Sequence, residues 1–335
     1  MIAIHSENTD FSKRWINYCK EKEIPYKIVN CYDNNIIEHL KDCKALFWHH
    51  NHRSFEDLLF AKQLLFALEH AGIKVFPDFK TGWHFDDKVA QKYLFEASGV
   101  PLVPSYVFYD KQQALEWAKN TTYPKVFKLR GGAGSSNVRL VKSYNENKKL
   151  IKKAFNKGFP ALNKKDKILD AIKLYKEGSV PFINIFKAIY LMYVKPSYYS
   201  KMISNERGYV YFQDFIANNK TDFRIKVVDQ KCWGFQRVVR KNDFRASGSG
   251  KLIFDNSKIP IEMIKIALET SQTLGLQSVA FDFVINNNQP LIVEISYCFG
   301  MDSSELNYGY WDQDLKFYKG SFNPFGWMIE SVINK

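Results

Sequence analysis

A lysine followed by a glycine-rich loop is the first feature of the sequence that suggests chemistry. Lys128 lies in the strand-like stretch 126–129, and the loop comes directly after it. Backbone N–H groups in such a loop can converge on phosphate oxygens, and the ammonium group adds a point charge. No G-K-[ST] ending makes this a Walker A motif, and an ordinary turn is the alternative. The loop residues of interest are Gly131, Gly132, Gly134, Ser135 and Ser136.

Two acidic residues lie in neighbouring strand-like segments near the end of the chain. Asp282 and Glu294 are each flanked by apolar residues, and the polar stretch 286–289 between them predicts a turn. A hairpin of this kind would bring both carboxylates together. Hard oxygen ligands suit Mg²⁺, which completes its shell with water and substrate phosphates. An inward carboxylate paired with an arginine is the alternative interpretation.

A series of arginines is interleaved with strand-like residues between these two features. Alternate positions of a strand place their side chains on one face. Guanidinium groups are suited to bidentate contact with phosphate or carboxylate. A ladder of surface ion pairs is the alternative. The series consists of Arg224, Arg237, Arg240 and Arg245.

The elements that would position these residues change in character along the chain. Strands are expected at 1–5, 24–29, 45–48 and 74–76, and helices at 10–22, 36–42 and 55–71. This alternation favours a parallel sheet with crossover helices. No G-x-G-x-x-G motif follows the first strand, so a dinucleotide site is not supported. Later helices are expected at 87–98, 111–119 and 261–274, and residues 145–200 are expected to be mostly helical. Later strands are expected at 104–109, 126–129, 209–215, 223–228, 232–239, 250–254, 278–285 and 291–295.

Composition narrows the class of protein. The chain has 335 residues, of which 46% are hydrophobic, and its net charge is +13. Residues 142–201 contain 14 lysines, no arginine and four acids, so this basic and mostly helical stretch holds +10 of that charge. A lysine-rich helical stretch is usually a solvated face. Because base-reading motifs are absent, we expect no specific nucleic acid partner.

The start of the chain and its cysteines bear on location. Residues 1–15 lack the pattern of a signal peptide, and no apolar stretch approaches 18 residues. The five cysteines form no CxxC pair, which suits reduced thiols. We therefore expect a cytoplasmic protein without membrane insertion.

Histidines and aromatic residues provide two further candidates. His49, His50 and His52 follow a predicted strand, where either a metal site or a substrate-contacting loop is conceivable. The aromatic segment 307–327 would either close over an acceptor substrate or pack onto the core.

The order of these motifs resembles the ATP-grasp superfamily, and more closely the branch containing glutathione synthetase and the ribosomal-protein glutamate ligase. The resemblance covers roughly residues 80–300 and leaves 145–205 unmatched. It rests on Lys88, Lys128 with its loop, Gln213-Asp214-Phe215-Ile216, Asp222-Phe223-Arg224, D-F-R-A-S-G-S-G at 243–250, and the Asp282/Glu294 pair.

The resemblance implies an ATP-grasp fold of mixed α/β and α+β class. An amino-terminal parallel α/β domain, residues 1–80, would precede two α+β subdomains that clasp ATP. Residues 81–212 would form the lid subdomain with the basic insertion, and residues 213–335 would carry the metal site. The implied cofactors are ATP and Mg²⁺, with Mn²⁺ as an alternative ion.

The resemblance also implies roles for single residues. Lys88 and Lys128 would hold ATP phosphates under the loop, the segment 213–216 would receive adenine, and Asp222 would contact ribose or an amine substrate. The catalytic set would be Arg224, Arg237 and Arg245, of which the last two would steady the transferred phosphoryl group. Asp282, Glu294 and Ser296 would hold the metal.

One departure from the family pattern concerns the metal site. The family commonly shows Glu-x-Asn, whereas this chain has Glu294-Ile295-Ser296, and Ser247 also stands in place of an Asn. A serine hydroxyl is a weaker metal ligand than an amide oxygen, so a second Mg²⁺ would be held through water.

The implied reaction is the joining of a carboxylate to an amine through an acyl phosphate. The substrates would be small molecules, or carboxylates and amines linked to a peptide or a sugar, and a homo-oligomer is left open. The alternatives are an ATP-grasp kinase or phosphotransferase, a catalytically weak ATP-binding regulator, and a basic module that binds an acidic polymer.

Overall fold

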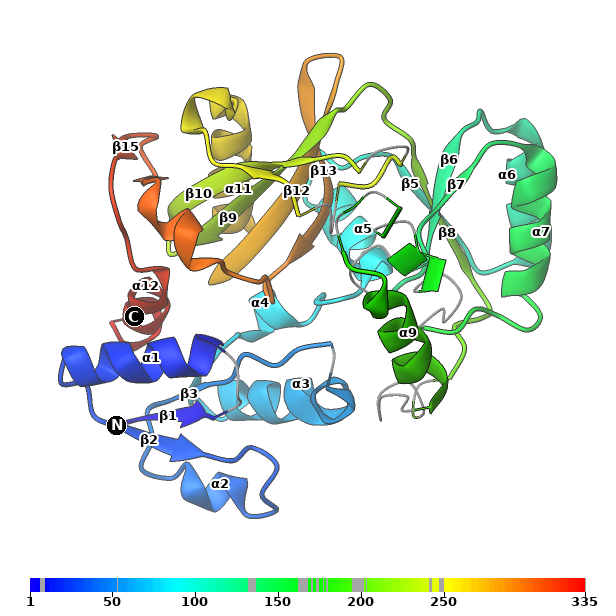
Figure 1. The fold of residues 1–335 in the computed structure, drawn as a ribbon. Coiled ribbons are helices and arrows are strands. Elements are labelled where there is room, and N and C mark those ends of the chain that lie inside the picture. Colours follow the sequence, from blue (N-terminus) through cyan, green and yellow to red (C-terminus); the bar gives the residue numbers. More distant parts are fainter. Residues whose placement is uncertain are drawn as a thin grey trace.

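The computed structural model describes residues 1–6, 10–52, 54–131, 137–161, 168–169, 171–172, 175–176, 178, 180–194, 202, 204–240, 243–246 and 250–334. Within these ranges the strands form three sheets, which lie side by side in Figure 1. The α/β and α+β fold class predicted from the sequence is confirmed.

The amino-terminal sheet is parallel, with strand order β2-β1-β3-β4. Alternate residues of its strands point into two separate cores, one with α1 and the carboxyl-terminal helix α12 (Pro324–Ile333), the other with α2 and α3. The sheet is therefore covered on both faces, as its apolar strands predict. Its elements are β1 (Ile2–His5), α1 (Asp10–Glu21), β2 (Tyr26–Val29), α2 (Ile36–His39), β3 (Ala45–Phe47), α3 (Phe55–His70) and β4 (Lys74–Phe76).

The lid sheet is antiparallel, with strand order β5-β8-β6-β7. Helices α6 and α7 pack on it through a core that includes Ala118, Phe127, Ile151 and Phe212. Its elements are β5 (Ser105–Phe108), α6 (Lys111–Asn120), β6 (Lys125–Lys128), β7 (Arg139–Val141), α7 (Tyr144–Ala154) and β8 (Val210–Asp214).

The large sheet has the order β13-β12-β9-β10-β14-β15, with β11 paired to β10. Helices α5 and α11 share a core with one face of it. Strand β9 shows why: Phe223, Ile225 and Val227 are buried in that core, so the polar residues between them point to the other face. The elements are α5 (Lys88–Ala97), β9 (Thr221–Val228), β10 (Lys231–Val238), β11 (Leu252–Ile253), α11 (Ile261–Leu274), β12 (Ser278–Asn286), β13 (Gln289–Ser296), β14 (Tyr310–Trp311) and β15 (Phe317–Tyr318).

Some predicted elements differ in length from the observed ones. The helix expected at 36–42 ends at His39, and the strand expected at 250–254 is reduced to Leu252–Ile253. Of the helical stretch expected at 145–200, α7 and α9 (Ile183–Ile189) lie in the described residues. Short α4 (Phe79–Gly82) links the amino-terminal sheet to α5. Among the described residues no helix has both the length and the apolar character needed to cross a membrane.

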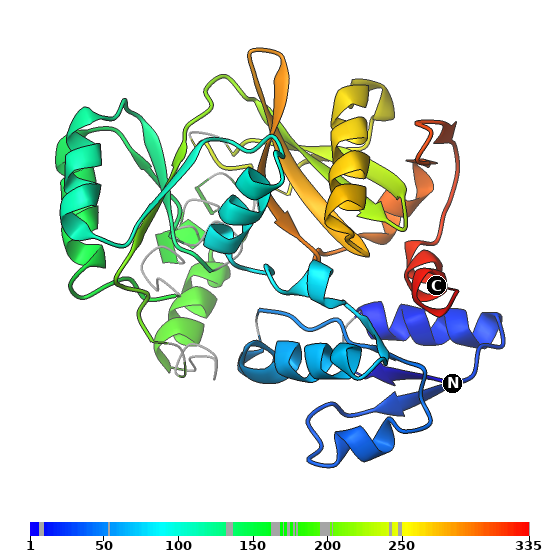
Figure 2. The same ribbon diagram turned by 180° about the vertical axis from the view of Figure 1, so that it is seen from behind.

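Helix α12 (Pro324–Ile333) returns the carboxyl-terminal end of the chain to the amino-terminal sheet. Met328, Ile329 and Val332 share a core with Ile2 and Trp15, and the two ends of the chain lie close together in Figures 1 and 2. The predicted domain limits, 1–80, 81–212 and 213–335, stay a prediction. They place α12 with residues 213–335, whereas α12 packs on the amino-terminal sheet.

Candidate active site

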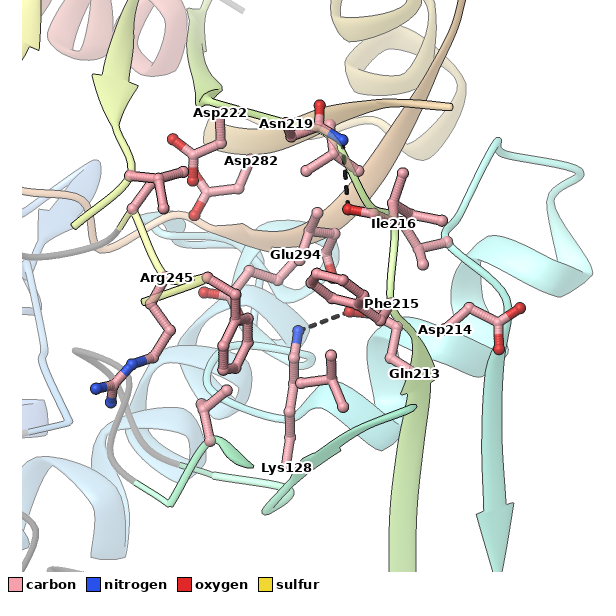
Figure 3. Close-up of a pocket in the computed structure, with 18 of the residues that line it drawn as sticks. Lys128, Gln213, Asp214, Phe215, Ile216, Asn219, Asp222, Arg245, Asp282 and Glu294 are labelled. Atoms are coloured by element: carbon pink, nitrogen blue, oxygen red, sulfur yellow. Dashed lines mark hydrogen bonds between the residues drawn. The ribbon is translucent and has the colours of Figure 1, made fainter. Parts of the chain in front are cut away.

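A cavity of about 310 Å³ is lined by residues from both the lid sheet and the large sheet (Figure 3). Strands β6 and β8 contribute from the lid sheet, strands β9, β10, β12 and β13 from the large sheet, and α5 supplies one lysine. Most residues singled out from the sequence meet here, although they are spread over about 200 positions of the chain. They are Lys88, Lys128, Gln213, Asp214, Phe215, Ile216, Asp222, Arg237, Arg245, Asp282 and Glu294.

Two lysines enter the cavity from different elements. Lys128, at the end of β6, donates from Nζ to Oε1 of Gln213 at 2.7 Å, as Figure 3 shows. Burial lowers the pKa of Lys128 to about 8. Lys88 lies 3.7 Å from Glu294. Burial disfavours the charged form of Lys88, but the surrounding carboxylates, Glu294 foremost, outweigh it and raise its pKa.

Helix α5 holds Lys88 in place through its amino-terminal cap and a clamp on β13. The side chain of Asp87 accepts hydrogen bonds from the N–H groups of Val89 and Ala90, which caps the helix. One turn further on, Gln91 donates to the carbonyl of Ile295 at 2.9 Å and accepts from its N–H at 3.1 Å. The Gln91 side chain thus forms with Ile295 the pair of hydrogen bonds that the backbone of a neighbouring strand would form. Because Gln91 and Lys88 are on the same helix, this contact fixes Lys88 beside Glu294.

The two carboxylates lie directly opposite each other on β12 and β13. Asp282 and Glu294 are register partners, and the ladder shifts by a bulge immediately after Asp282. Arg224 donates to both oxygens of Asp282 at 2.7 and 2.8 Å, and Arg237 approaches one of them at 2.9 Å. Burial alone would raise the pKa of Asp282, but the two guanidinium groups lower it well below its usual range.

The three arginines of the predicted catalytic set have different positions. Arg237 lines the cavity and bridges two acids, because it also binds Asp222 with two hydrogen bonds of 2.7 Å. Arg224 binds Asp282 and is not among the residues that line the cavity. Arg245 lines the cavity but is paired with Asp243 at 2.7 Å, and Figure 3 shows its guanidinium group directed away from Lys128.

The segment 213–216 connects the two sheets along one side of the cavity. Gln213 donates to the carbonyl of Val293, next to Glu294, as well as accepting from Lys128. Asp214 pairs with Lys125 at 2.6 Å. The ring of Phe215 meets that of Phe244 edge to face. Gln213 therefore joins β6 of the lid sheet to β13 of the large sheet, and we call the segment 213–216 that continues from it the hinge segment.

Sequence analysis missed several residues of the cavity wall. Asn219 donates to the carbonyl of Ile285 at 3.0 Å and accepts from its N–H at 2.9 Å, which ties the turn after the hinge to β12. Valines supply much of the apolar wall. Their alternation along predicted strands was the signal that could have identified them. The missed wall residues are Val103, Asn218, Asn219, Thr221, Val239, Val284 and Val293.

Other predicted site residues lie elsewhere or outside the described ranges. Ser296 is the register partner of Ala280 and is not among the cavity-lining residues. Gly131 lies against Asp86 and Glu206, also away from the cavity wall. Gly132, Gly134, Ser135, Ser136 and Ser247 are outside the described residues.

A second charged group lies on the same face of the large sheet, one alternate position further along β9. Lys226 donates to both carboxylate oxygens of Glu305 at 2.7 and 2.6 Å and to the carbonyl of Gly300 at 2.8 Å. Glu305 also accepts from Trp233 and from the N–H of Asp302. The two side chains are 1% and 2% exposed, and burial lowers the pKa of Lys226 to about 8.

His49 and His50 are buried among aromatic side chains, whereas His52 is partly exposed. His49 stacks on Phe11 with ring centroids 3.7 Å apart, and Tyr297 donates to the carbonyl of His50. Burial lowers the pKa of His49 to about 3, so this imidazole is neutral at pH 7. Among the described residues no group of three or more His, Cys, Asp or Glu is arranged to hold a metal ion. A substrate-contacting role of this loop stays a prediction.

Aromatic residues of the segment 307–327 pack on the core. Tyr310, Phe322 and Trp327 contact one another and pack against the same core as Trp233. None of them is a cavity-lining residue. This arrangement agrees with the packing alternative rather than with closure over a substrate.

Comparisons with known proteins identify the fold. Residues 187–314 match the profile of the RimK-like ATP-grasp domain. No curated protein sequence matches the chain. The RimK domain ATP-grasp protein of Sphaerobacter thermophilus has a similar structure, with a TM-score of 0.57 at 14% identity, over 100% of this chain and 99% of that one.

Two further solved structures have the same fold. The biotin carboxylase domain of the Hydrogenobacter thermophilus 2-oxoglutarate carboxylase, in complex with MgADP, gives a TM-score of 0.58 at 12% identity, over 99% of this chain and 69% of that one. The D-alanine–D-alanine ligase of Bacillus anthracis, complexed with ATP, gives 0.53 at 12% identity, over 99% and 95%. At sequence identities this low, the similarity concerns the fold alone.

Proposed function

We propose that this chain, which has the ATP-grasp fold, is a Mg²⁺-ATP-dependent ligase that joins a carboxylate to an amine through an acyl phosphate. One observation carries the proposal. Lys88, Lys128 and Arg237 surround the same cavity as the facing carboxylates Asp282 and Glu294. Phosphoryl transfer depends mainly on positioning and on charge neutralisation, and this cavity brings both kinds of charge together.

The cavity offers different surroundings to the two halves of ATP. Lys88 and Lys128 would bind phosphate oxygens, because an ammonium group in a buried site interacts strongly with anions. The base would lie along the hinge segment 213–216, where Phe215 and the valines provide an apolar wall. Asp222 lines the cavity beside Arg237, in agreement with a contact to ribose or to the amine substrate.

The donor set fits a magnesium ion that is bound together with phosphates. Asp282 stays ionised because two guanidinium groups depress its pKa, and Glu294 lies opposite it. Two carboxylates leave most of the octahedral shell to water and ATP, which is the usual arrangement for Mg²⁺. The ion would neutralise charge on the phosphates. It would also compete with Arg224 and Arg237 for the oxygens of Asp282.

The reaction balances without a side-chain nucleophile. A substrate carboxylate oxygen attacks the γ-phosphorus, the bond to the bridging oxygen breaks, and ADP leaves. The amine nitrogen then attacks the acyl carbon, inorganic phosphate leaves, and the nitrogen loses a proton to form the amide. Arg237 and Arg245 would offset negative charge on the phosphoryl group. Suitable substrates are small molecules, or carboxylates and amines attached to a peptide or a sugar.

Trapping the activated carboxylate tests this proposal. With ATP, Mg²⁺ and a panel of carboxylates, hydroxylamine replaces the amine, and the product is a hydroxamate formed in equal amount with ADP and phosphate. Glu294→Gln should abolish hydroxamate formation, whereas Glu116→Gln, an exposed residue on α6, should leave it unchanged. Absence of ADP under every condition, with Mn²⁺ as well as Mg²⁺, would refute the ligase. ADP formed with a phosphorylated product and no hydroxamate would instead identify a kinase.

A further inference from the structure

The backbone of Arg130 is bonded on both sides at the point where the chain leaves β6 for the glycine-rich loop. Its N–H donates to the hydroxyl of Tyr209 at 2.6 Å, and its carbonyl accepts from the N–H of Lys88 at 3.0 Å. Lys88 is the first residue of α5, and Lys128 is the last residue of β6. The contact therefore joins the two elements that supply the cavity lysines.

Tyr209 holds Arg130 where the ladder between two lid strands ends. The last pair of the ladder between β6 and β8 is Lys128 and Tyr211. The same register, continued by two residues, places Tyr209 opposite Arg130. At this position a side-chain hydroxyl accepts the N–H of Arg130, and it therefore fixes where the loop leaves the lid sheet.

The hydroxyl of Tyr209 has a defined orientation because it donates to the carboxylate of Glu206. A phenol has one O–H to donate, and its oxygen can accept at the same time, so the bonds to Glu206 and Arg130 coexist. Burial raises the pKa of Tyr209, and the neighbouring Glu206 raises it further. The phenol thus stays protonated at neutral pH, which the bond to Glu206 requires.

Glu206 is fixed to the rest of the lid through its backbone. Phe159 and Glu206 form an isolated antiparallel bridge, with N–H to carbonyl bonds of 2.9 and 2.8 Å in the two directions. Gly158 lies against this bridge with φ +69°, and a Cβ there would be 2.5 Å from the carbonyl oxygen of Glu206. Only glycine allows this approach. Glu206 therefore gives Tyr209 a rigid support within the lid.

The first residue of the loop also lies against Glu206. A Cβ at Gly131 would be 3.3 Å from Oε1 of Glu206 and 3.5 Å from Oδ2 of Asp86, so the chain passes close to both carboxylates. Burial opposes the charged form of Lys88, and Glu206 is one of the carboxylates that outweigh it and raise its pKa. Neither Tyr209 nor Glu206 is a cavity-lining residue. Their effect on the cavity therefore passes through neighbouring residues.

We propose that Tyr209 is a positioning residue of the nucleotide site. Its hydroxyl holds the base of the glycine-rich loop against α5, so that Lys88 and Lys128 face the same phosphates. This role rests on the proposed function, because it takes the cavity to bind Mg²⁺-ATP. The attraction between two cations and a phosphate chain depends on their distances. A change in the spacing of the two lysines therefore weakens the binding of phosphates.

Nucleotide binding by a variant without the hydroxyl tests the proposal. Tyr209→Phe keeps the ring and removes both hydrogen bonds. We expect the dissociation constant for Mg²⁺-ATP, measured by isothermal titration calorimetry on the full chain, to increase about tenfold. The dissociation constant for adenosine should stay the same, because adenosine has no phosphate for Lys88 and Lys128 to bind. A purely structural role of Tyr209 would weaken the binding of both ligands alike.

Substitutions of Glu206 separate its hydrogen bond from its charge. Glu206→Gln and Glu206→Ala both remove the negative charge that acts on Lys88, but only glutamine can still accept from Tyr209. We expect the alanine variant to bind Mg²⁺-ATP at least about threefold more weakly than the glutamine variant, with equal affinity for adenosine. Equal affinity of the two variants for Mg²⁺-ATP would contradict the hydrogen-bonded support of Tyr209.

The matched control is a second tyrosine of the lid with the same kinds of hydrogen bond. The hydroxyl of Tyr123 donates to the carbonyl of Ala118 at 2.7 Å and accepts from Asn147 at 3.0 Å. Tyr123 does not line the cavity, so Tyr123→Phe should bind Mg²⁺-ATP like the wild type. Circular dichroism verifies that each variant is folded.

The outcomes distinguish this role of Tyr209 from the proposed ligase activity. Tyr209→Phe that binds Mg²⁺-ATP like the wild type would overturn the proposal, and so would an equal loss of affinity for adenosine. Wild-type protein that binds Mg²⁺-ATP but forms no hydroxamate would refute the ligase alone, and a loss of Mg²⁺-ATP affinity in Tyr209→Phe would still support the positioning role. Wild-type protein that binds no Mg²⁺-ATP would refute both.

Discussion

Two groups of charged side chains on strand β9 differ in what surrounds them. The open cluster consists of Asp222, Arg224, Arg237 and Asp282, and three of its four members line the cavity. The sealed pair consists of Lys226 and Glu305, whose side chains are almost fully buried. Arg224 and Lys226 are two residues apart and point to the same face of the sheet.

The difference between them lies in whether the partners can be exchanged. In the sealed pair Lys226 donates to Glu305 and Gly300, and Trp233 and the N–H of Asp302 also bind Glu305. A ligand has no access to these atoms. The open cluster has the same kinds of groups next to a cavity, where phosphates and a cation can replace the internal partners. Similar ion pairs thus stabilise the fold at one position and prepare a binding site at the next.

The largest effect should come from breaking the sealed pair. Lys226→Met leaves the carboxylate of Glu305 buried without its cation, and we expect the free energy of unfolding to fall by about 3–5 kcal/mol. Urea unfolding followed by tryptophan fluorescence measures this loss. In the control, Lys119→Met removes the exposed partner of Glu116 and should change the free energy of unfolding by less than about 1 kcal/mol. Equal effects of the two substitutions would show that the sealed pair has no special structural role.

Breaking the open cluster should affect turnover more than stability. Asp282→Asn removes the charge that Arg224 and Arg237 share and one of the two predicted metal ligands. We expect the rate of ADP release to fall by about a hundredfold or more. The free energy of unfolding should fall less than in Lys226→Met, because Arg237 lines the cavity and water can reach it there. Unchanged turnover in this variant would reject the metal assignment.

The sequence predicted these two groups unequally. Asp282 and Glu294 were identified because a polar turn between two apolar strands makes a hairpin, and the hairpin register depends on local geometry alone. The sealed pair was missed, since Lys226 and Glu305 are 79 positions apart and neither belongs to a recognisable motif. The same reason explains the missed contact between Gln91 and Ile295. Long-range side-chain contacts depend on how finished elements pack, which periodicity does not encode.

The fold, like the site, has parts that the sequence predicted and parts that it did not. Alternating strands and helices predicted the parallel sheet of residues 1–76, and its boundaries agree to within a few residues. The return of α12 to that sheet was not predicted, because an apolar helix at the end of a chain does not indicate which core it joins. Helix α9 was expected to belong to a solvated basic stretch. Its apolar surface became apparent only when the structure showed that nothing among the described residues buries it.

The smallest expected effect tests the cation that faces the open cluster across the cavity. Burial lowers the pKa of Lys128 to about 8, so the free protein loses this ammonium charge as the pH rises through 8. A phosphate binds the protonated form better, and the dissociation constant for Mg²⁺-ATP should therefore increase about tenfold between pH 7 and pH 9. Isothermal titration calorimetry at both pH values measures the change. Lys128→Arg keeps its charge at pH 9, so its affinity, although weaker overall, should be the same at both pH values. The control Lys119→Arg should keep the wild-type pH dependence; if Lys128→Arg also keeps it, another group is responsible and Lys128 does not bind the phosphates.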